Sequence, residues 1–236
     1  MEPIATERLV LRPFTPGDFD ALFAYQSRPD VTRWLEWDAR TEEQVRAALA
    51  RKIAAVAVVD EGDFLALAIT KKDTGELVGD VILAFASAEH RAGEIGYIVH
   101  PDHQGLGYST EACREVLRIA FDDLGLHRVI GRLEPRNVAS ARVLEKLGMR
   151  REALFVDNEM IKGEWQSEAV YAILDREWRA AADRFTSGSA GRSGARRRPD
   201  RRAARGSSRG RPSPGRHPRA SAGPAGCTGT DPGSLA

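Results

Sequence analysis

Residues 94–112 read Glu94-Ile95-Gly96-Tyr97-Ile98-Val99-His100-Pro101-Asp102-His103-Gln104-Gly105-Leu106-Gly107-Tyr108-Ser109-Thr110-Glu111-Ala112. A strand pattern runs into a loop with two glycines, and a helix pattern follows directly. The start of a helix presents unpaired backbone N–H groups and the positive end of the helix dipole, which together bind phosphate groups. Two glycines before a helix also fit a plain tight turn, so this segment alone leaves both interpretations open.

Two widespread phosphate-binding motifs fit the loop poorly. The dinucleotide-binding pattern needs a third glycine three residues after Gly107, where this chain has Thr110. The ATP-binding pattern needs a lysine directly after the loop, and no lysine follows here. The loop therefore favours neither of these two classes.

Outward from this loop, the hydrophobic period alternates between two and about 3.6 residues. Helix caps are expected at Thr15 and Thr41, and a turn between two strands at Lys72–Gly75. The patterns predict strands at Arg8–Arg12, Phe64–Thr70, Leu77–Phe85, Glu94–Val99, Arg128–Glu134, Arg151–Val156 and Glu168–Leu174, and helices after Thr15 and at Thr41–Val56, Ser109–Leu124 and Val138–Leu147. Hairpin strands followed by alternating strands and helices predict an α+β fold with a mixed sheet.

The composition divides the chain into two unlike parts. The 236 residues carry 35 Lys and Arg against 34 Asp and Glu, and 42% are hydrophobic, which excludes disorder of the whole chain. Residues 186–236 hold eleven Arg, no Lys and two acidic residues, a balance of +9, so residues 1–185 carry −8. Because residues 186–236 also lack Val, Ile, Phe, Trp, Tyr and Met, we predict a disordered tail after a single domain of residues 1–185.

The two cysteines, Cys113 and Cys227, are too few for a disulfide framework or a zinc site. Cys113 lies in a helix pattern, where core packing explains it better than covalent catalysis. The first residues lack the basic start and apolar run of a signal peptide, and no stretch reaches about 18 apolar residues. We expect a cytoplasmic protein without membrane contact and without a metal.

A second motif follows at residues 134–149: Glu134-Pro135-Arg136-Asn137-Val138-Ala139-Ser140-Ala141-Arg142-Val143-Leu144-Glu145-Lys146-Leu147-Gly148-Met149. In this order the two motifs resemble the GNAT superfamily of acetyl-CoA-dependent N-acetyltransferases, and most closely its branch that acetylates the N-terminal amines of ribosomal proteins. The resemblance spans about residues 5–180 and leaves the tail uncovered. It implies a single GNAT-type domain whose mixed, mostly antiparallel, twisted sheet is flanked by helices.

The resemblance implies acetyl-CoA as a cosubstrate. The family's pyrophosphate loop falls on Asp102–Gly107, with Asp102 in place of the usual Gln or Arg. The pantetheine arm would lie along the backbone of Tyr97, Ile98 and Val99 like an added strand. Asn137 would hydrogen-bond this arm, although a helix cap explains the same residue and one side chain can serve both. The expected phosphate donors are the backbone amides of Gln104, Gly105, Leu106, Gly107, Tyr108 and Ser109.

Acetyl transfer places three demands on the protein. The amine must lose a proton before it attacks, because an ammonium has no lone pair and a lysine-like amine has an ordinary pKa of about 10.4. The developing oxyanion needs a hydrogen-bond donor, which an amide of the strand before the loop can supply. The departing thiolate needs a proton or a hydrogen bond.

By resemblance the role of thiolate donor falls on Ser140. Many family members place a Tyr seven residues after the asparagine, but this chain has Leu144 there. In the ribosomal-protein branch the donor is a Ser three residues after the asparagine, and Ser140 stands at that position. A solvated hydroxyl in the first turn of a helix is the alternative explanation of Ser140.

Two glutamates are candidates for the general base. The same branch places a carboxylate nineteen residues beyond the serine, which is Glu159 here. Glu94 is the second candidate, because other family members use a carboxylate at the start of this strand. A charge exposed to solvent is the alternative explanation of each.

Other residues receive structural interpretations first. We expect His100, His103 and His127 to be loop residues rather than proton acceptors. The aromatic residues of the N-terminal helical region either line the acceptor cleft, as the resemblance implies, or pack in the core; they are Tyr25, Trp34 and Trp37.

The leading hypothesis is an N-acetyltransferase that moves acetyl from acetyl-CoA to a primary amine by direct attack in a ternary complex. The acceptor is a protein N-terminus, a lysine or a small amine. One alternative is a nucleic-acid- or ribosome-binding protein that acts through weak, non-specific contacts of the basic tail. The other is an acyl-CoA-binding sensor without catalysis. A monomer and a homodimer are both compatible with the sequence.

Overall fold

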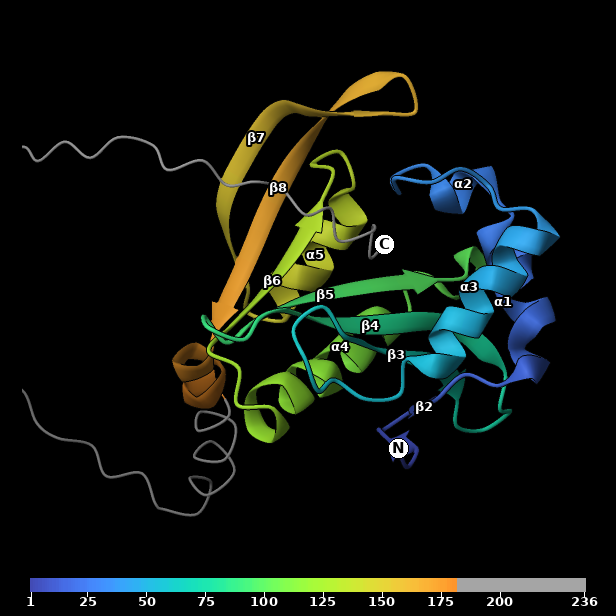
Figure 1. The fold of residues 1–236 in the computed structure, drawn as a ribbon, viewed down its shortest axis with the longest axis horizontal. Helices are drawn as coiled ribbons and strands as arrows, with labels where there is room; N and C mark the ends of the chain where they lie inside the picture. The colour runs from blue at the N-terminus through green and yellow to red at the C-terminus, as the bar shows by residue number, and fades with distance from the viewer. Residues whose placement is uncertain (182–236) are drawn as a thin grey trace, which may run out of the picture.

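The computed structural model describes residues 1–181, which form an eight-stranded sheet with helices on both faces (Figure 1). The strands are β1 (Ile4–Ala5), β2 (Leu9–Arg12), β3 (Phe64–Lys71), β4 (Leu77–Ser87), β5 (Ala92–Val99), β6 (Arg128–Leu133), β7 (Arg150–Ile161) and β8 (Glu164–Leu174). The helices are α1 (Phe19–Gln26), α2 (Pro29–Thr32), α3 (Glu42–Ala54), α4 (Tyr108–Arg118) and α5 (Val138–Lys146), with the short turns η1 (Pro16–Asp18) and η2 (Pro101–His103) and the π-helical turn η3 (Ile119–Asp123). Residues 175–181 are also helical.

The order of strands in the sheet is β1-β2-β3-β4-β5-β6-β8-β7. Neighbouring strands are antiparallel except β5 and β6, which confirms the predicted mixed, mostly antiparallel sheet. The parallel register covers only three pairs, from Ala92 with Arg128 to Glu94 with Ile130. Strand β5 continues to Val99, so the sheet opens between β5 and β6 beyond Glu94 (Figure 1).

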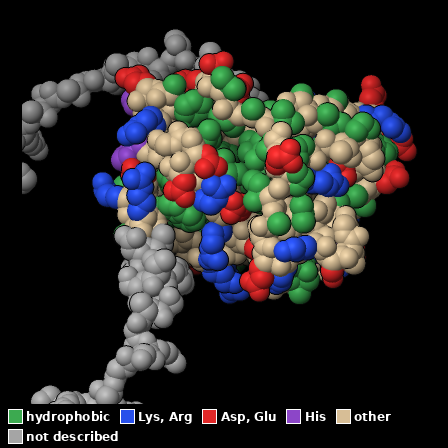
Figure 2. All heavy atoms as spheres, turned by 90° about the horizontal axis from the view of Figure 1, so that it is seen from below, with side chains coloured by type: hydrophobic (Ala, Val, Ile, Leu, Met, Phe, Trp, Pro, Cys, Tyr) green, Lys and Arg blue, Asp and Glu red, His purple; other side chains and the backbone are tan. Residues whose placement is uncertain are grey.

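The surface of the described residues mixes both signs of charge on the face that Figure 2 presents. Acidic and basic side chains alternate there with hydrophobic ones, without a large area of one sign. On that face the acidic excess of residues 1–185 is therefore not gathered into a single patch.

Strand β3 shows how the sequence builds a core on each face of the sheet. Successive side chains of a strand point to opposite faces. Leu65, Leu67 and Ile69 belong to the buried cluster under α4. Ala66 and Ala68 belong to the cluster that includes residues of α1 and α3. The alternation of large and small apolar residues thus places the two helical layers.

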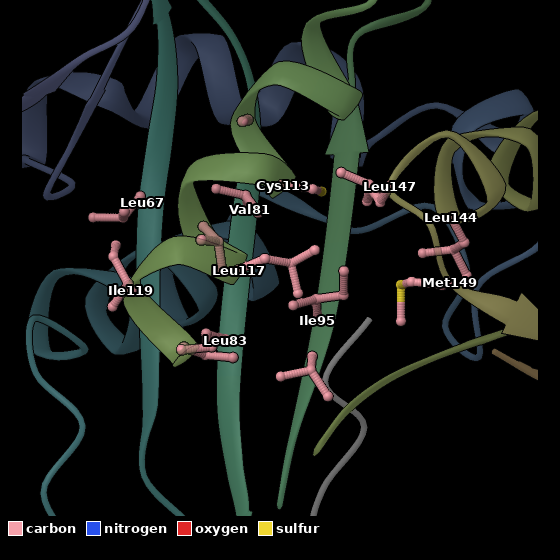
Figure 3. Close-up of a cluster of buried hydrophobic side chains, with 14 of the residues drawn as sticks. Leu67, Val81, Leu83, Ile95, Cys113, Leu117, Ile119, Leu144, Leu147 and Met149 are labelled. Atoms are coloured by element: carbon pink, nitrogen blue, oxygen red, sulfur yellow. The ribbon is translucent and has the colours of Figure 1, made fainter. Parts of the chain in front are cut away.

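Helix α4 covers the first of these clusters (Figure 3). Cys113 and Leu117 of α4 pack among Val81 of β4 and Ile95 of β5. Cys113 is fully buried, which confirms its predicted place in the core, and burial raises the pKa of its thiol. A thiol in this state is not a nucleophile at neutral pH.

Several elements differ from the predicted ones. The predicted helix at Ser109–Leu124 begins at Tyr108, and its last turn is π-helical, since Leu124 N–H donates to Ile119 O at 2.9 Å. Strand β1 and helix α2 are additional elements. Strands β7 and β8 are longer than predicted and form a hairpin that projects from the rest of the sheet (Figure 1).

The predicted disordered tail at residues 186–236, its Cys227 and the predicted domain boundary at residue 185 lie outside the described residues. Within residues 1–181 no helix has the length and hydropathy needed to cross a bilayer.

Candidate active site

The glycine loop joins β5 to α4, as the sequence predicts. Gly105 and Gly107 have φ angles of 76° and 85°, a left-handed conformation that glycine adopts without strain. The amides from Gly105 to Thr110 have no acceptor within residues 1–181. The Gln104 amide differs, because it donates to Pro101 O at 3.1 Å. Five of the six predicted phosphate donors are therefore free.

Arg8, just before β2, fixes the outer side of this loop. Its guanidinium donates to Leu106 O at 2.9 Å, forms an ion pair with Glu111 at 2.7 Å and stacks on the Tyr108 ring at 5.0 Å. Glu111 also accepts hydrogen bonds from the Thr6 hydroxyl and the Arg8 amide. Partial burial alone would raise the pKa of Glu111, but these bonds hold it below its usual value. The contacts of Arg8 and Glu111 thus fix the position of the loop.

The backbone of β5 is open toward β6 beyond their short pairing. The His127 amide donates to Arg91 O at 2.7 Å, so Arg91 directs its carbonyl to the β6 side. Alternate residues of a strand direct their backbone groups to the same side. Tyr97 and Val99 therefore present theirs to the opening, whereas Ile98 directs its groups to β4. The predicted contacts with an added strand are geometrically available at Tyr97 and at the Val99 N–H, whereas Val99 O already accepts a hydrogen bond from Gln104 Nε2 at 3.1 Å.

A pair of hydroxyl groups lies on the α4 and α5 side of the opening. Tyr97 Oη is 2.8 Å from Ser140 Oγ and 3.0 Å from Ser140 O. Asn137 Oδ1 accepts the Ser140 N–H at 3.1 Å, so Asn137 is the cap of α5 that its sequence context allows. Burial raises the pKa of Tyr97, so its phenol stays protonated at neutral pH.

A cleft of about 720 Å³ lies on the other side of the opening. Ile82, which packs with the cluster of α1 and α3, contributes to its wall. Glu94 of β5 and Glu159 of β7 both line it, so the two predicted base candidates share one cleft. Glu36, Glu134 and Glu168 line it too. We call these five glutamates and the space they surround the acidic cleft.

One guanidinium lies among these carboxylates. Arg132 Nε is 3.3 Å from Glu94 Oε2, and Arg132 Nη1 is 3.3 Å from Glu168 Oε1. Burial raises the pKa of Glu94, while Arg132 lowers it by a smaller amount. Partial burial, Glu168 and Glu36 raise the pKa of Glu159. The pKa of each base candidate is thus closer to neutral pH than that of an ordinary glutamate, as general bases require.

The hairpin of β7 and β8 meets the segment after α2 at the rim of the acidic cleft. Lys162, at the hairpin tip, donates to Thr32 O at 2.7 Å and lies 3.7 Å from Asp38. Trp34 and Lys162 both line the cleft. Within residues 1–181 the hairpin and the N-terminal helical region therefore enclose the cleft between them.

The other two aromatic candidates have core or surface positions. Tyr25 is fully buried and donates its hydroxyl proton to Asp80, which Lys52 also contacts at 2.8 Å. Trp37 lies outside the cleft lining, with the Arg40 guanidinium 3.7 Å from its ring centroid. Of the three aromatic residues, Trp34 alone takes the predicted place in the cleft wall.

His100, His103 and His127 lie in loops or short turns, and none of these three lines the acidic cleft. His100 Nδ1 accepts the Asp102 N–H at 3.2 Å at the start of η2. His103 Nε2 is 3.2 Å from Glu76. His127 Nδ1 is 3.2 Å from Asp175. These positions match the structural interpretation of the three side chains.

Residues 8–150 match the family model of the GNAT acetyltransferase domain. This chain belongs to the GNAT family. Over 176 residues it is 33% identical to the uncharacterized N-acetyltransferase YnaD of Bacillus subtilis, which covers 74% of this chain and 98% of YnaD. The crystal structure of a GNAT-family acetyltransferase from Bacillus anthracis superimposes with a TM-score of 0.67 at 32% identity, covering 74% of this chain and 99% of that one.

A further relative bears on the branch of the GNAT family. The Bacillus subtilis protein named "Putative ribosomal N-acetyltransferase YdaF" is 33% identical over 104 residues, 44% of this chain and 57% of YdaF. The predicted GNAT membership, fold class and enzyme class are thereby confirmed. GNAT enzymes use acetyl-CoA, and the free loop amides and the open edge of β5 fit that cosubstrate. Among residues 1–181 no group of three or more His, Cys, Asp or Glu could hold a metal.

Sequence reasoning missed four contributions to this GNAT site: Glu36, Arg132, Glu168 and the side chain of Tyr97. Arg132 and Glu168 meet because β6 pairs with β8 antiparallel, with Leu133 opposite Ala169. Strand alternation alone gives neither this pairing nor its register. For Tyr97 the sequence does contain a signal. Successive side chains of β5 point to opposite faces of the sheet, so Tyr97, two residues after Ile95, lies with Ile95 on the face covered by α4.

Proposed function

We propose that the chain transfers the acetyl group of acetyl-CoA to a primary amine by direct attack in a ternary complex. The observation that carries this proposal is the opening between β5 and β6, which has a pair of hydroxyl groups on one side and the acidic cleft on the other. An acceptor enters through the acidic cleft, and the acetyl donor lies on the side of α4 and α5.

Acetyl-CoA supplies the acetyl group as a thioester. The amides of Gly105 to Ser109 bind its pyrophosphate, helped by the positive end of the α4 dipole. Tyr97 and Val99 hold the pantetheine arm through their backbone groups. The Asn137 side chain adds a hydrogen bond through Nδ2, because its Oδ1 already caps α5.

Glu159 is the first candidate for the group that accepts the proton of the incoming ammonium, and Glu94 is the second. An amine must be neutral to attack, and the raised pKa of each carboxyl group brings it closer to that of the amine. The negative charge of the acidic cleft also attracts a cationic acceptor before the proton is removed.

Two groups stabilise charge on the acetyl donor's side. A β5 amide that faces the opening donates a hydrogen bond to the carbonyl oxygen. The Ser140 hydroxyl donates a proton or hydrogen bond to the departing sulfur. The acceptor is a protein N-terminus, a lysine or a small amine, and the similarity to YdaF supports the first of these.

The test is acceptor-dependent release of the CoA thiol by the full chain. The acceptor panel contains N-terminal peptides, lysine peptides, polyamines and aminoglycosides. We expect one class to stimulate release. Glu159→Gln and Ser140→Ala should each lower kcat by roughly 10²- to 10⁴-fold, with the Kd of acetyl-CoA unchanged. Glu94→Gln under the same conditions shows which carboxylate is the base.

Glu145→Gln is the matched control, because Glu145 is an exposed glutamate of α5 outside the acidic cleft. It should retain full activity. Binding of acetyl-CoA without release by any acceptor would favour the sensor alternative. Absence of acetyl-CoA binding would refute the assignment of the glycine loop.

A further inference from the structure

Gln166 of β8 has a side-chain amide that lies in the wall of the acidic cleft without a partner. The residue is 8% exposed and lines the cleft. Among residues 1–181 its side chain makes no hydrogen bond. The amide is not sealed off, because Gln26 Nε2 alone is both fully enclosed and unpaired in this part of the chain. A buried amide without a partner is costly, so Gln166 is suited to bind a group that enters the cleft.

The register of the hairpin directs this amide toward the first base candidate. Gln166 stands directly opposite Glu159 in the pairing of β7 with β8, and opposed side chains point to the same face. Glu168, which shares that face by alternation, contacts Arg132 at 3.3 Å in the cleft. Trp165 is 60% exposed and belongs to the opposite face. The Gln166 amide therefore lies beside Glu159 on the cleft side.

The chemistry of the cleft restricts what can bind there. Ionised carboxylates only accept hydrogen bonds, and the Arg132 guanidinium already contacts Glu94 and Glu168. The Gln166 amide has a carbonyl oxygen that accepts and an Nε2 group that donates. An ammonium group satisfies the carboxylates and the amide oxygen, but it has no lone pair for Nε2. A complementary acceptor therefore carries a hydrogen-bond-accepting oxygen close to its amine.

Among the candidate acceptors, the α-amine of a peptide meets this demand best. The carbonyl group of its first residue is attached to the same carbon atom as the amine. A lysine side chain separates its amine from the nearest carbonyl by its whole aliphatic chain. A polyamine has no carbonyl, so it would fill the cleft and leave Nε2 unpaired, which disfavours its binding.

We propose that Gln166 is a specificity-determining residue whose Nε2 donates a hydrogen bond to the first carbonyl oxygen of a peptide acceptor, so that the cleft selects peptide α-amines over lysine side chains and polyamines. This inference rests on the proposed function, in which the acceptor enters through the acidic cleft. The same hydrogen bond would hold the α-amine beside Glu159, the first candidate for the group that removes its proton.

The test compares acceptors and variants of the full chain by CoA-thiol release. The acceptors are a lysine-free peptide with a free N-terminus, a peptide with a blocked N-terminus and one lysine, and spermidine. An α-amine also has a lower ordinary pKa than a lysine amine, so preference by the unaltered chain is not decisive. The decisive quantity is the ratio of kcat/KM for the free N-terminus to that for spermidine. Gln166→Glu and Gln166→Met, which both remove Nε2, should lower this ratio about tenfold.

A change in the peptide itself identifies the contact. Sulfur in place of the first carbonyl oxygen is a weaker hydrogen-bond acceptor and leaves the amine in place. We expect this change to lower kcat/KM about fivefold in the unaltered chain and less than about twofold in Gln166→Met. An equal effect in both chains would overturn the inference. Should the variants not fold, absence of a sulfur effect in the unaltered chain would overturn it as well.

Gln44→Glu is the matched control, because it makes the same chemical change at an exposed glutamine outside the acidic cleft. Gln44 Oε1 accepts the Thr41 N–H at 2.9 Å at the start of α3, and a glutamate can accept the same bond. The acceptor ratio should not change in this variant. Thermal unfolding of each variant identifies any loss that is due to an unfolded fraction.

The outcomes distinguish this inference from the proposed function. If amines are acetylated and the Gln166 variants lower kcat/KM for all acceptors by the same factor, or do not lower it, the inference fails and the proposed function stands. If no amine stimulates release of the CoA thiol, the proposed function fails and the inference fails with it.

Discussion

Arg132 controls the charge state of the acidic cleft at the scale of a single residue. Its guanidinium contacts Glu94 and Glu168 at the same 3.3 Å distance, and both contacts cross between strands. Burial raises the pKa of Glu94, and Arg132 partly opposes this increase by favouring the ionised carboxylate. The ionisation of Glu94 therefore depends on this neighbour.

Arg132→Gln should raise the pKa of Glu94 further, because the favourable charge is removed. If Glu94 takes part in proton removal, the acid limb of the kcat/KM profile moves to higher pH, since protonated Glu94 then persists to higher pH. The measurement is a pH profile of kcat/KM. Arg142→Gln, at an exposed arginine of α5, is the control and should leave the profile in place. A limb that stays in place or moves to lower pH in Arg132→Gln contradicts the prediction.

The site residues differ in how far the sequence could predict them. The resemblance to the GNAT family, applied through its motif offsets, led to Glu159 and Ser140; Glu159 lies in the acidic cleft and Ser140 lies beside Tyr97. Spacing carries such information because each residue follows a motif at a fixed offset. Arg132 carries no such offset, since its contact with Glu168 depends on the register of β6 with β8, which are separated by α5 and β7.

Among the elements, the glycine loop and α4 form the best-defined part of the site. Gly107 has a φ of 85°, and an added Cβ would lie 3.3 Å from Arg8 Nη2. The same arginine holds Leu106 and Glu111. A side chain at Gly107 therefore disturbs both the backbone of the loop and the group that braces it.

Gly107→Ala should destabilise the chain by about 1–2 kcal/mol, the cost of a left-handed conformation for a residue with a Cβ. It should also raise the Kd of acetyl-CoA, because Arg8 must move away from the loop. Gly125→Ala is the matched control: Gly125 has a φ of 63° with open space around it, and it lies between η3 and β6. The control should lose similar stability with an unchanged Kd. Calorimetry of acetyl-CoA binding and denaturant unfolding measure the two quantities, and an equal Kd in both variants contradicts the prediction.

The elements also show where sequence patterns lose their meaning. Strands β2 to β5 were predicted within a few residues, because β2 and β5 alternate between buried and half-buried residues and β3 and β4 form short, almost continuously buried apolar runs. Strand β7 is exposed along most of its length, and three residues, 156–158, stand opposite Ser167 alone between two registered pairs. Because β7 has no buried face and its register is interrupted, its sequence lacks a hydrophobic period. The strand therefore continues beyond its predicted end at Val156.

At the scale of the whole chain, the two parts carry opposite charge. Residues 1–185 have a balance of −8 and residues 186–236 a balance of +9. The similarity to YnaD covers 98% of that protein with 176 residues of this chain, and the GNAT match ends at residue 150. We therefore expect acetyl transfer to depend on residues 1–185 and any affinity for nucleic acid to depend on the basic residues that follow.

Deletion of residues 186–236 should leave kcat/KM within about twofold and abolish retention of nucleic acid on a filter. Such retention by the full chain should weaken steeply between low and moderate salt, because it depends on counterion release. Filter binding at two salt concentrations, together with CoA-thiol release, measures both effects. Retention of nucleic acid by the shortened chain would contradict the prediction and assign this affinity to the folded domain.

The three-pair seam between β5 and β6 also bears on the lifetime of the protein. Strands β4 and β5 share eight registered pairs, so the seam is the weakest join within the sheet on either side of β5. Partial unfolding follows the least protected boundary, which here separates β1–β5 from β6–β8. A cosubstrate that binds only when β1–β5 and β6–β8 are joined disfavours their separation by mass action. Resistance of the chain to proteolysis is thereby coupled to the acetyl-CoA concentration, and a cell short of acetyl-CoA would degrade this enzyme faster.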